Sequence, residues 1–298
     1  MTARRTTQRV VSMDGVLVAP EDARVSVYDR GFLYGDSVFE TIRTYGGRPF
    51  ALGEHLARLG RSAARVGIRL PIEEAAFAEE IGHALAAVDN PESTVRVMIT
   101  RGTGPLGLDP NLAERPLRVM LIEPLVPLPA ALYREGVAVI THRTERAADD
   151  APGAKVGNYL GGMLALRAAK DVGAHEAILL DTHGAVIEGT TSNVFAVTGR
   201  TLRTPPEAAG ILAGITRAWV LEEGRAAGLD VRETAMKPAD LAEADEVFLT
   251  STLREVLPVV KVDGRAVGDG VPGPITRALH RGFRTRAGLG DRAMPWEP

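Results

Sequence analysis

The chain contains 298 residues, with 35 lysines and arginines against 38 aspartates and glutamates and a formal net charge of −3. Hydrophobic residues make up 45% of it and charged residues 24%, which excludes disordered and collagen-like classes. The lack of cysteine excludes a disulfide scaffold, a thiolate metal site and a cysteine nucleophile. Without a basic excess, a signal peptide or an apolar run of about 18 residues, we expect a cytoplasmic globular protein with no membrane or nucleic-acid partner.

The N-terminal part of the chain predicts a hairpin, two helices and two further strands. An Asp-Gly pair between apolar runs is typical of a tight β-turn. Apolar residues at helical spacing predict the helices, and β-rich runs predict the strands. We expect the turn at Asp14-Gly15, the helices over 52–66 and 72–88, and the strands over 94–100 and 117–122.

Residues 124–129 read Pro-Leu-Val-Pro-Leu-Pro, a pattern typical of a stiff linker. The pattern as a whole predicts an α+β protein of two domains, with a small N-terminal domain over 1–125, a linker over 126–134 and a larger domain over 135–298. In the larger domain we expect strands over 137–141, 247–249 and 256–262, a hairpin within 177–197, a helix over 158–172, and helices starting at Ile215 and Pro274.

Some motifs are discounted on their context. Gly102 to Gly107 match GxGxxG, but a turn-like stretch follows instead of a helix, so we do not expect a dinucleotide site. The six histidines show no metal-binding spacing, so we expect no metal and interpret each as a surface or packing residue.

Only four lysines are available for amine chemistry, and Lys155 is the best placed. It lies between a polar loop and an apolar helix start, where a side chain can point inward. A desolvated lysine has a lowered pKa and becomes a Schiff-base nucleophile. We expect the other three, Lys170, Lys237 and Lys261, to be solvated or next to turns.

Two later segments complement this lysine. Glu188 interrupts a strand-like apolar pattern in Glu-Gly-Thr-Thr-Ser-Asn-Val-Phe, and the segment 210–217 is a glycine-punctuated turn that runs into a helix. Backbone N–H groups at a helix start, beside the Thr216 hydroxyl, form a phosphate site. Singly, these features also fit an exposed glutamate and a plain helix cap. Together they supply the amine, the carboxylate and the phosphate cradle that pyridoxal phosphate (PLP) requires.

These segments, in this order, resemble the fold-type IV PLP enzymes, also called class IV aminotransferases. The similarity runs from Asp29-Arg30-Gly31 to Val262-Asp263-Gly264. It implies a fold like that of D-amino acid aminotransferase, with PLP in the cleft between a small N-terminal domain and a larger PLP-binding domain. It also implies a homodimer.

The resemblance further implies the roles of the cofactor-binding residues. Lys155 would be the catalytic residue, forming the Schiff base and moving the proton in a ping-pong aldimine/ketimine mechanism. Glu188 would pair with the pyridine nitrogen, and Tyr159 would bond to the ring hydroxyl. Arg58, on the polar side of the first helix, would join Ile215, Thr216 and Thr252 around the phosphate.

The signature within the family is mixed. D-amino acid aminotransferases carry an arginine and a histidine in the loop after Thr100, where this chain has Leu106 and Leu108. We therefore expect a transaminase for branched-chain-like hydrophobic amino acids, with 2-oxoglutarate or pyruvate as acceptor and D-amino acids or (R)-amines still open as donors. The alternatives are aminodeoxychorismate lyase, which eliminates pyruvate with the same cofactor, and a non-catalytic relative.

Three arginines are candidates for the substrate carboxylate. Arg96 and Arg101 should face opposite sides of a regular strand, so at most one of them meets the substrate, and Arg254 is the third candidate. The candidate substrate-binding residues are Tyr34, Phe39, Arg96, Arg101, Leu106, Leu108, Leu253 and Arg254.

Overall fold

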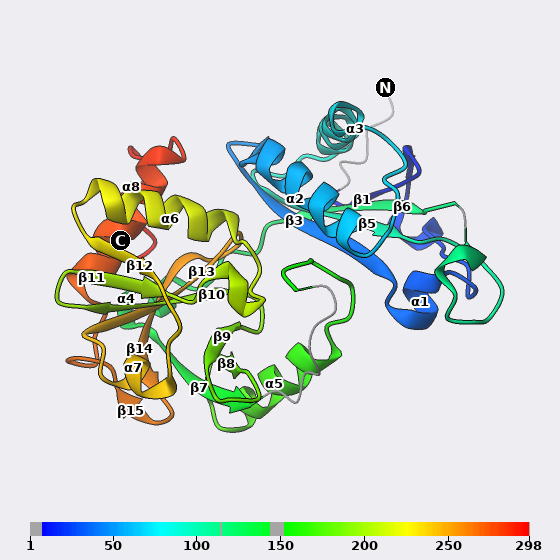
Figure 1. The fold of residues 1–298 in the computed structure, drawn as a ribbon. Helices are drawn as coiled ribbons and strands as arrows, with labels where there is room; N and C mark the ends of the chain where they lie inside the picture. Colours follow the sequence, from blue (N-terminus) through cyan, green and yellow to red (C-terminus); the bar gives the residue numbers. More distant parts are fainter. Residues whose placement is uncertain (1–7, 114, 144–151, 298) are drawn as a thin grey trace. The chain divides into compact units, whose positions relative to one another are not determined.

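The computed structural model describes residues 8–113, 115–143 and 152–297. The chain forms two compact units (Figure 1). Unit 1 contains Met1–Val126 and the short segment Ala154–Asn158, and unit 2 contains Pro127–Gly153 and Tyr159–Pro298. Lys155 therefore belongs to unit 1, although the residues on both sides of its segment belong to unit 2.

This division differs from the predicted domains in two places. The expected linker over 126–134 includes most of helix α4 (Ala130–Glu135), which begins directly after Pro129 and belongs to unit 2. The Tyr133 hydroxyl of α4 donates a hydrogen bond to the Arg254 carbonyl oxygen at 2.9 Å, which anchors the helix. The second difference is the segment 154–158, which pairs with a strand of unit 1 and so leaves the domain predicted over 135–298.

Unit 1 is built on a six-stranded antiparallel sheet in the order β2-β1-β6-β5-β3-β4. The predicted hairpin is confirmed: Asp14 and Gly15 have φ values of 49° and 90°, as a tight turn between twisted strands requires. Because β5 and β6 are antiparallel, the GxGxxG stretch joins neighbouring strands and forms no βαβ unit. The strands are β1 (Val10–Met13), β2 (Val16–Val18), β3 (Ser37–Tyr45), β4 (Arg48–Pro49), β5 (Ser93–Thr100) and β6 (Arg118–Pro124).

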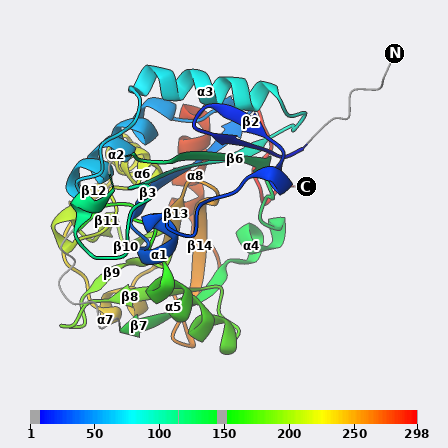
Figure 2. The same cartoon turned by 90° about the vertical axis from the view of Figure 1, so that its right-hand side faces the viewer.

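Two of the helices of unit 1 lie over one face of its sheet (Figures 1 and 2). They are the two predicted helices, with slightly shorter ends. Alternate residues of the strands, such as Val38 and Ile42 of β3, are fully buried against them. The helices and 3₁₀ turns of unit 1 are α1 (Arg30–Tyr34), α2 (Leu52–Arg65), α3 (Glu74–Ala86), η1 (Pro20–Asp22) and η2 (Pro110–Leu112).

Unit 2 contains a nine-stranded mixed sheet in the order β12-β11-β10-β13-β14-β7-β8-β9, with β15 also paired to β14. The hairpin predicted within 177–197 consists of β8 and β9, and a third strand, β10, follows it. The strands are β7 (Val137–Arg143), β8 (Glu176–Leu180), β9 (Val186–Gly189), β10 (Asn193–Thr198), β11 (Thr201–Thr204), β12 (Asp230–Glu233), β13 (Glu246–Ser251), β14 (Glu255–Val262) and β15 (Arg265–Ala266).

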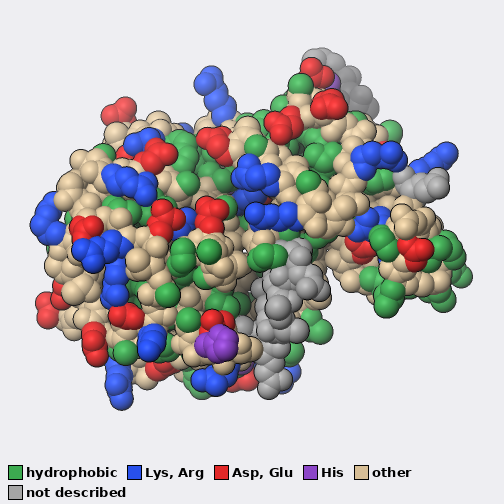
Figure 3. Space-filling model, viewed as in Figure 1, with side chains coloured by type: hydrophobic (Ala, Val, Ile, Leu, Met, Phe, Trp, Pro, Cys, Tyr) green, Lys and Arg blue, Asp and Glu red, His purple; other side chains and the backbone are tan. Residues whose placement is uncertain are grey.

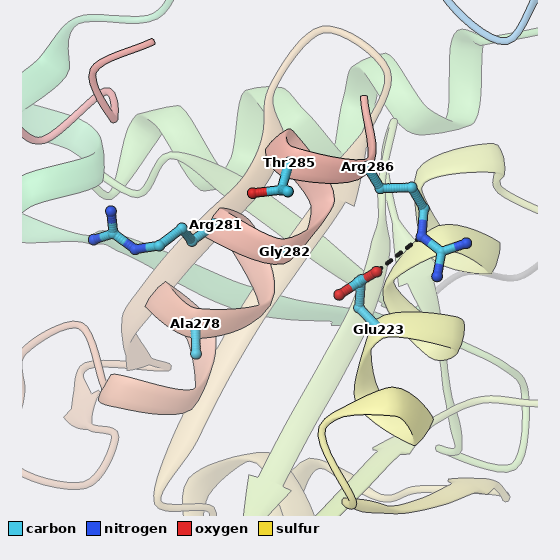
Figure 4. Close-up of a pocket in the computed structure, with 6 residues that line it drawn as sticks. All are labelled: Glu223, Ala278, Arg281, Gly282, Thr285 and Arg286. Carbon is cyan, nitrogen blue, oxygen red and sulfur yellow. Dashed lines mark hydrogen bonds and ion pairs between the residues drawn. The ribbon is translucent and has the colours of Figure 1, made fainter. Parts of the chain in front are cut away.

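The helices of unit 2 pack on this sheet. Helices α6 and α8 cover a cluster that includes the stacked rings of Phe195 and Phe248. A shallow pocket lies between these two helices, where Gly282 lets Glu223 approach and Arg286 pairs with Glu223 at 2.8 Å (Figure 4). Besides α4, the elements are α5 (Leu160–Asp171), η3 (Glu207–Ala209), α6 (Ile215–Ala226), α7 (Pro238–Ala242) and α8 (Pro274–Arg286).

The surface agrees with the balanced composition. Acidic and basic side chains are interspersed on the face that Figure 3 shows. In the described parts of the chain, none of the helices combines the length and the apolar character needed to cross a bilayer.

Candidate active site

The backbone of Lys155 is held between a strand and a helix of unit 1. The Lys155 carbonyl oxygen accepts a hydrogen bond from the Phe39 N–H at 3.0 Å, and the Gly157 N–H donates to the Ser37 carbonyl oxygen at 2.8 Å. The Lys155 N–H donates to the Ser62 hydroxyl of α2 at 3.1 Å. A Cβ on Gly157 would lie 2.1 Å from the Ser37 hydroxyl oxygen, so a larger residue here would displace the Ser37 side chain.

The side chain of Lys155 lies against an aromatic ring. Its Nζ is 4.6 Å from the centroid of the buried Phe39 ring, and the Arg96 guanidinium carbon is 4.0 Å from the same centroid. Both are cation–π contacts. Of the predicted substrate residues, Phe39 and Arg96 are therefore brought next to the predicted nucleophile.

Arg58 is buried, which corrects the prediction that it lies on the polar side of α2. Its Nε and Nη2 donate to the two carboxylate oxygens of Glu40 in β3, each at 2.7 Å. His55, one turn earlier on α2, places Nδ1 2.7 Å from Glu40 Oε2. The prediction failed because the sequence does not show that β3 carries a buried carboxylate opposite this helix face.

The environment of this cluster fixes its charges. Burial raises the pKa of Glu40, but hydrogen bonds from Arg58 and His55 outweigh it and lower the pKa to about 2. Burial lowers the pKa of His55, with Glu40 opposing. A neutral His55 then donates through Nδ1 to an ionised Glu40. His55 Nε2 is buried and has no hydrogen-bond partner among the described residues.

Sequence reasoning missed both partners of Arg58. By sequence, His55 is one of six surface or packing histidines, and Glu40 has no role. The one available signal is the position of Glu40 between Val38 and Ile42, on the apolar face of its strand.

In unit 2, Glu188 contacts the turn that precedes α6. Its Oε2 accepts hydrogen bonds from the Leu212 N–H at 3.1 Å and from Asn193 Nδ2 at 3.3 Å. Asn193 Nδ2 also donates to the Leu212 carbonyl oxygen at 3.0 Å. The predicted carboxylate and the predicted phosphate cradle therefore lie next to each other within this unit.

The cradle itself starts at a glycine. Helix α6 begins at Ile215, as predicted, and its N-cap, Gly214, provides no side-chain cap. A Cβ on Gly214 would lie 2.0 Å from Asn193 Oδ1, so a larger residue here would displace the Asn193 side chain that bonds to Glu188. Thr216 is buried in the first turn, and Thr252 lies in the turn that follows β13.

The hydroxyl of Thr250 and the ring of Tyr159 lie in the same unit. Thr250 pairs with Asn193 in the sheet, and its buried Oγ1 has no hydrogen-bond partner among the described residues. Tyr159 is the N-cap residue of α5. Gly162 is near both Tyr159 and the loop after Glu188: a Cβ on it would lie 3.6 Å from the Thr190 carbonyl oxygen and 3.9 Å from the Tyr159 ring. Tyr159 therefore lies close to that loop.

Two of the three arginines proposed for the substrate carboxylate pair with a carboxylate of their own unit. Arg254 pairs with the buried Glu176 and with the Thr191 hydroxyl. Arg101 lies just beyond β5, pairs with Asp36 at 2.7 Å, and donates to the carbonyl oxygens of Val66 and Gly67.

The remaining predicted substrate residues are not brought together around Lys155 by any described contact. The Tyr34 hydroxyl accepts a hydrogen bond from the Gly107 N–H at 3.1 Å, which ties α1 to the loop after β5. Leu106 and Leu108 are exposed on that loop, and Leu253 lies in the turn after β13.

The chain matches the family described as amino-transferase class IV over residues 37–262. It is 38% identical over 284 residues to a Methanocaldococcus jannaschii protein provisionally named a branched-chain-amino-acid aminotransferase, covering 94% of this chain and 98% of that one. It is 35% identical to the D-alanine aminotransferase of Bacillus licheniformis, covering 90% of this chain and 93% of the relative.

Solved structures of aminotransferases are also similar to this chain. The Escherichia coli branched-chain amino acid aminotransferase superposes with a TM-score of 0.89 at 30% identity, covering 96% of this chain and 97% of that one. A hypothetical aminotransferase from Mycobacterium tuberculosis, in its PLP-bound form, superposes with a TM-score of 0.82 at 27% identity, covering 95% of this chain and 100% of that one.

The buried cluster predicts a stepwise acid sensitivity. Because the pKa of His55 is lowered, its contribution to stability is present above pH 6.5 and is lost as the pH falls below that value. The contribution of Glu40 is lost as the pH falls from 4.5 towards 2 and amounts to about 3 kcal/mol. We expect His55→Asn, which keeps a donor but does not titrate, to flatten the stability curve between pH 6.5 and 4.5.

Urea unfolding at a series of pH values measures this effect. His83→Asn, on the exposed face of α3, is the matched control and should follow the wild-type curve. Parallel curves for wild type and His55→Asn would contradict the assignment of the first step to His55.

Proposed function

This chain belongs to the class IV aminotransferase family and is a PLP-dependent aminotransferase, and on that premise we propose that Lys155 is its catalytic residue. The observation that carries the proposal is the position of Lys155. Its backbone is fixed between β3 and α2, and its amine lies 4.6 Å from the centroid of the buried Phe39 ring. A lysine in such surroundings is a suitable Schiff-base nucleophile.

The residues of the chain fit this cofactor. Gly214 and the uncapped start of α6 offer N–H groups to a phosphate, and the orphaned Thr250 hydroxyl lies on the neighbouring strand. The similar Mycobacterium tuberculosis protein is described as PLP-bound, which supports the same cofactor here. We assign the phosphate to Arg58, Ile215, Thr216 and Thr252, the ring nitrogen to Glu188 and the ring hydroxyl to Tyr159.

The chemistry of the chain's own residues follows from this assignment. When bound, PLP supplies an electron-accepting ring that stabilises negative charge at the substrate α-carbon. Lys155 Nζ takes the α-proton and returns it, so this one amine serves as base and acid. The Glu188 carboxylate, held by Leu212 and Asn193, is the partner that keeps a ring nitrogen protonated.

We propose hydrophobic, branched-chain-like amino acids as donors and 2-oxoglutarate or pyruvate as acceptors. Leu106 and Leu108, in the loop after β5, give that loop an apolar character. The names of the relatives include both branched-chain and D-alanine aminotransferases, so the assay below includes donors of both configurations. Aminodeoxychorismate lyase is not favoured, since the relatives described above are named as aminotransferases.

Among the arginines, we assign the substrate carboxylate to Arg96. Its guanidinium lies on the same Phe39 ring as the Lys155 amine, within a single unit. An α-carboxylate bound at Arg96 would bring the substrate amino group close to Lys155.

We also propose a homodimer, formed through an exposed apolar surface of unit 1. Arg30 of α1 donates to the carbonyl oxygens of Gly107 and Leu108, so α1 and the loop form one surface. Phe32 is 71% exposed and Leu108 is 81% exposed on it. Large apolar side chains exposed on one surface are typical of a protein interface.

The assignment of the nucleophile gives a direct prediction. With PLP added, the wild-type protein should gain a visible absorption band that changes when an amino donor is supplied. Lys155→Ala should lose the band and at least about 10³-fold of the transamination rate, because it removes both nucleophile and base. Lys170→Ala, on the exposed end of α5, is the control and should behave as wild type.

The donor panel contains L-leucine, D-alanine, an (R)-amine and aminodeoxychorismate, each with and without a keto acid. Keto-acid-dependent turnover of a hydrophobic amino acid is expected. Release of pyruvate from aminodeoxychorismate, with no transamination of any amine, would overturn the aminotransferase assignment in favour of the lyase.

A second set of assays tests Arg96. Arg96→Met should lower kcat/KM for amino acids by about 10²-fold, the cost of an ionic hydrogen-bonded contact. It should leave turnover of an (R)-amine, which has no carboxylate, within about threefold of wild type if the wild type accepts one. With amino acids alone, the readout is a rise in KM for both donor and keto acid. Equal losses for amine and amino acid, or an unchanged KM, would exclude this role.

The proposed assembly is tested by molecular mass. Light scattering should give wild-type protein about twice the mass of the 31.7 kDa chain, and Leu108→Asp should shift it towards the single-chain mass. Val126→Asp introduces the same charge at an exposed valine outside this surface and should leave the mass unchanged. A monomeric wild type would refute the dimer.

A further inference from the structure

Glu40 is a carboxylate on the apolar face of a strand. Its neighbours on that face, Val38 and Ile42, are fully buried in the core of unit 1, and Glu40 is fully buried as well. Burying an ion pair carries a large desolvation cost, and apolar side chains of similar volume at such positions are often equally or more stabilising. Stability alone therefore does not explain a carboxylate at this position.

The contact between Glu40 and Arg58 fixes the orientation of a guanidinium. Two parallel N–H···O bonds of 2.7 Å hold the planar group at two points, which prevents rotation about its long axis. A guanidinium has five N–H donors, and this contact uses two of them, one on Nε and one on Nη2. Such an arginine is oriented before any anion arrives.

His55 completes the cluster without adding charge. It is fully buried, its pKa is lowered by burial, and its Nδ1 lies 2.7 Å from Glu40 Oε2. With His55 neutral, the charges of Glu40 and Arg58 cancel. The cluster therefore has no net positive charge to attract an anion. What it provides is a fixed direction of the Arg58 N–H donors.

The same face of α2 also holds Lys155. His55, Arg58 and Ser62 are spaced three and four residues apart, which places them along one stripe of the helix. Ser62 accepts the Lys155 N–H. Arg58 and the Lys155 backbone are therefore fixed to one helix face, and Glu40 determines how the Arg58 guanidinium is turned relative to that lysine.

We propose that Glu40 is a positioning residue for phosphate recognition: it holds Arg58 in the orientation that accepts the phosphate monoester of the cofactor, and His55 holds Glu40. This inference rests on the proposed function, in which Arg58 binds the PLP phosphate.

The test compares PLP with pyridoxal, which has the same aldehyde and ring but no phosphate. Cofactor-depleted full-length protein is titrated with each, and the visible absorption band gives the two affinities. We expect Glu40→Gln to weaken PLP binding about tenfold or more and to leave pyridoxal binding unchanged, so that the preference for PLP falls. Arg58→Ala gives the reference for a lost phosphate contact.

Glu80→Gln is the matched control. Glu80 forms the same two-bond contact with Arg118 in unit 1, at 2.8 Å for each bond, away from the Lys155 segment. It should leave both affinities at wild-type values. Equal losses of PLP and pyridoxal affinity in both the Glu40 and the Glu80 variants would indicate a general effect of breaking an ion pair. That result would overturn the proposal.

Two conservative variants keep the test decisive if Glu40→Gln fails to fold. Glu40→Asp retains the carboxylate charge on a side chain that is one methylene shorter, and His55→Asn retains one donor to Glu40. Each should lower the ratio of PLP to pyridoxal affinity by a smaller factor, and phosphorus NMR of the bound cofactor should report a changed phosphate environment. Wild-type ratios in both, or tighter PLP binding in any Glu40 variant, would refute the positioning role.

The outcomes also separate this inference from the proposed function. If the wild-type protein gains no visible band with either compound, the proposed function fails. If the wild type prefers PLP and all Glu40 and His55 variants keep that preference, the proposed function stands and only the role of Glu40 fails.

Discussion

The position of Lys155 depends on a short backbone contact with the edge of β3. A lysine side chain is long and flexible, so its direction has to come from the backbone that carries it. The hydrogen bonds from Phe39 to Lys155 and from Gly157 to Ser37 supply that constraint. Consecutive residues of β3 point to opposite faces of the sheet. Phe39 therefore meets the lysine amine, while Glu40 points to α2 and meets Arg58.

The arginine excess of the chain has a structural use. Arg58, Arg101 and Arg254 each pair with a carboxylate of their own unit, namely Glu40, Asp36 and Glu176. The fork-shaped guanidinium can bond to two acceptors at once and remains charged when buried, which lysine does less well. Most of these contacts hold loops and helix faces in place, so a high arginine count says little about substrate charge.

Local patterns predicted much of the fold, and long-range pairing explains the errors. The two helices of unit 1 and the start of α6 follow from spacing and from short segments of sequence. The environment of Arg58 does not, because it is set by Glu40, 18 residues away in another element. The sequence leaves Arg254 as a substrate candidate for the same reason, since its partner Glu176 lies 78 residues away.

The turn that contains Thr252 is also held by contacts with residues that are distant in the sequence. Glu255, directly after this turn, has a φ of 58°, a left-handed conformation that costs a non-glycine residue about 1 kcal/mol. Its buried carboxylate lies 2.6 Å from His280 Nε2 of α8, which favours this backbone conformation. The Tyr133 hydroxyl of α4 also donates to the carbonyl oxygen of Arg254, the residue before Glu255. Contacts from two helices, α4 and α8, therefore hold the turn. The geometry of Thr252 thus depends on the last helix of the chain, beyond every segment in which the family motifs occur.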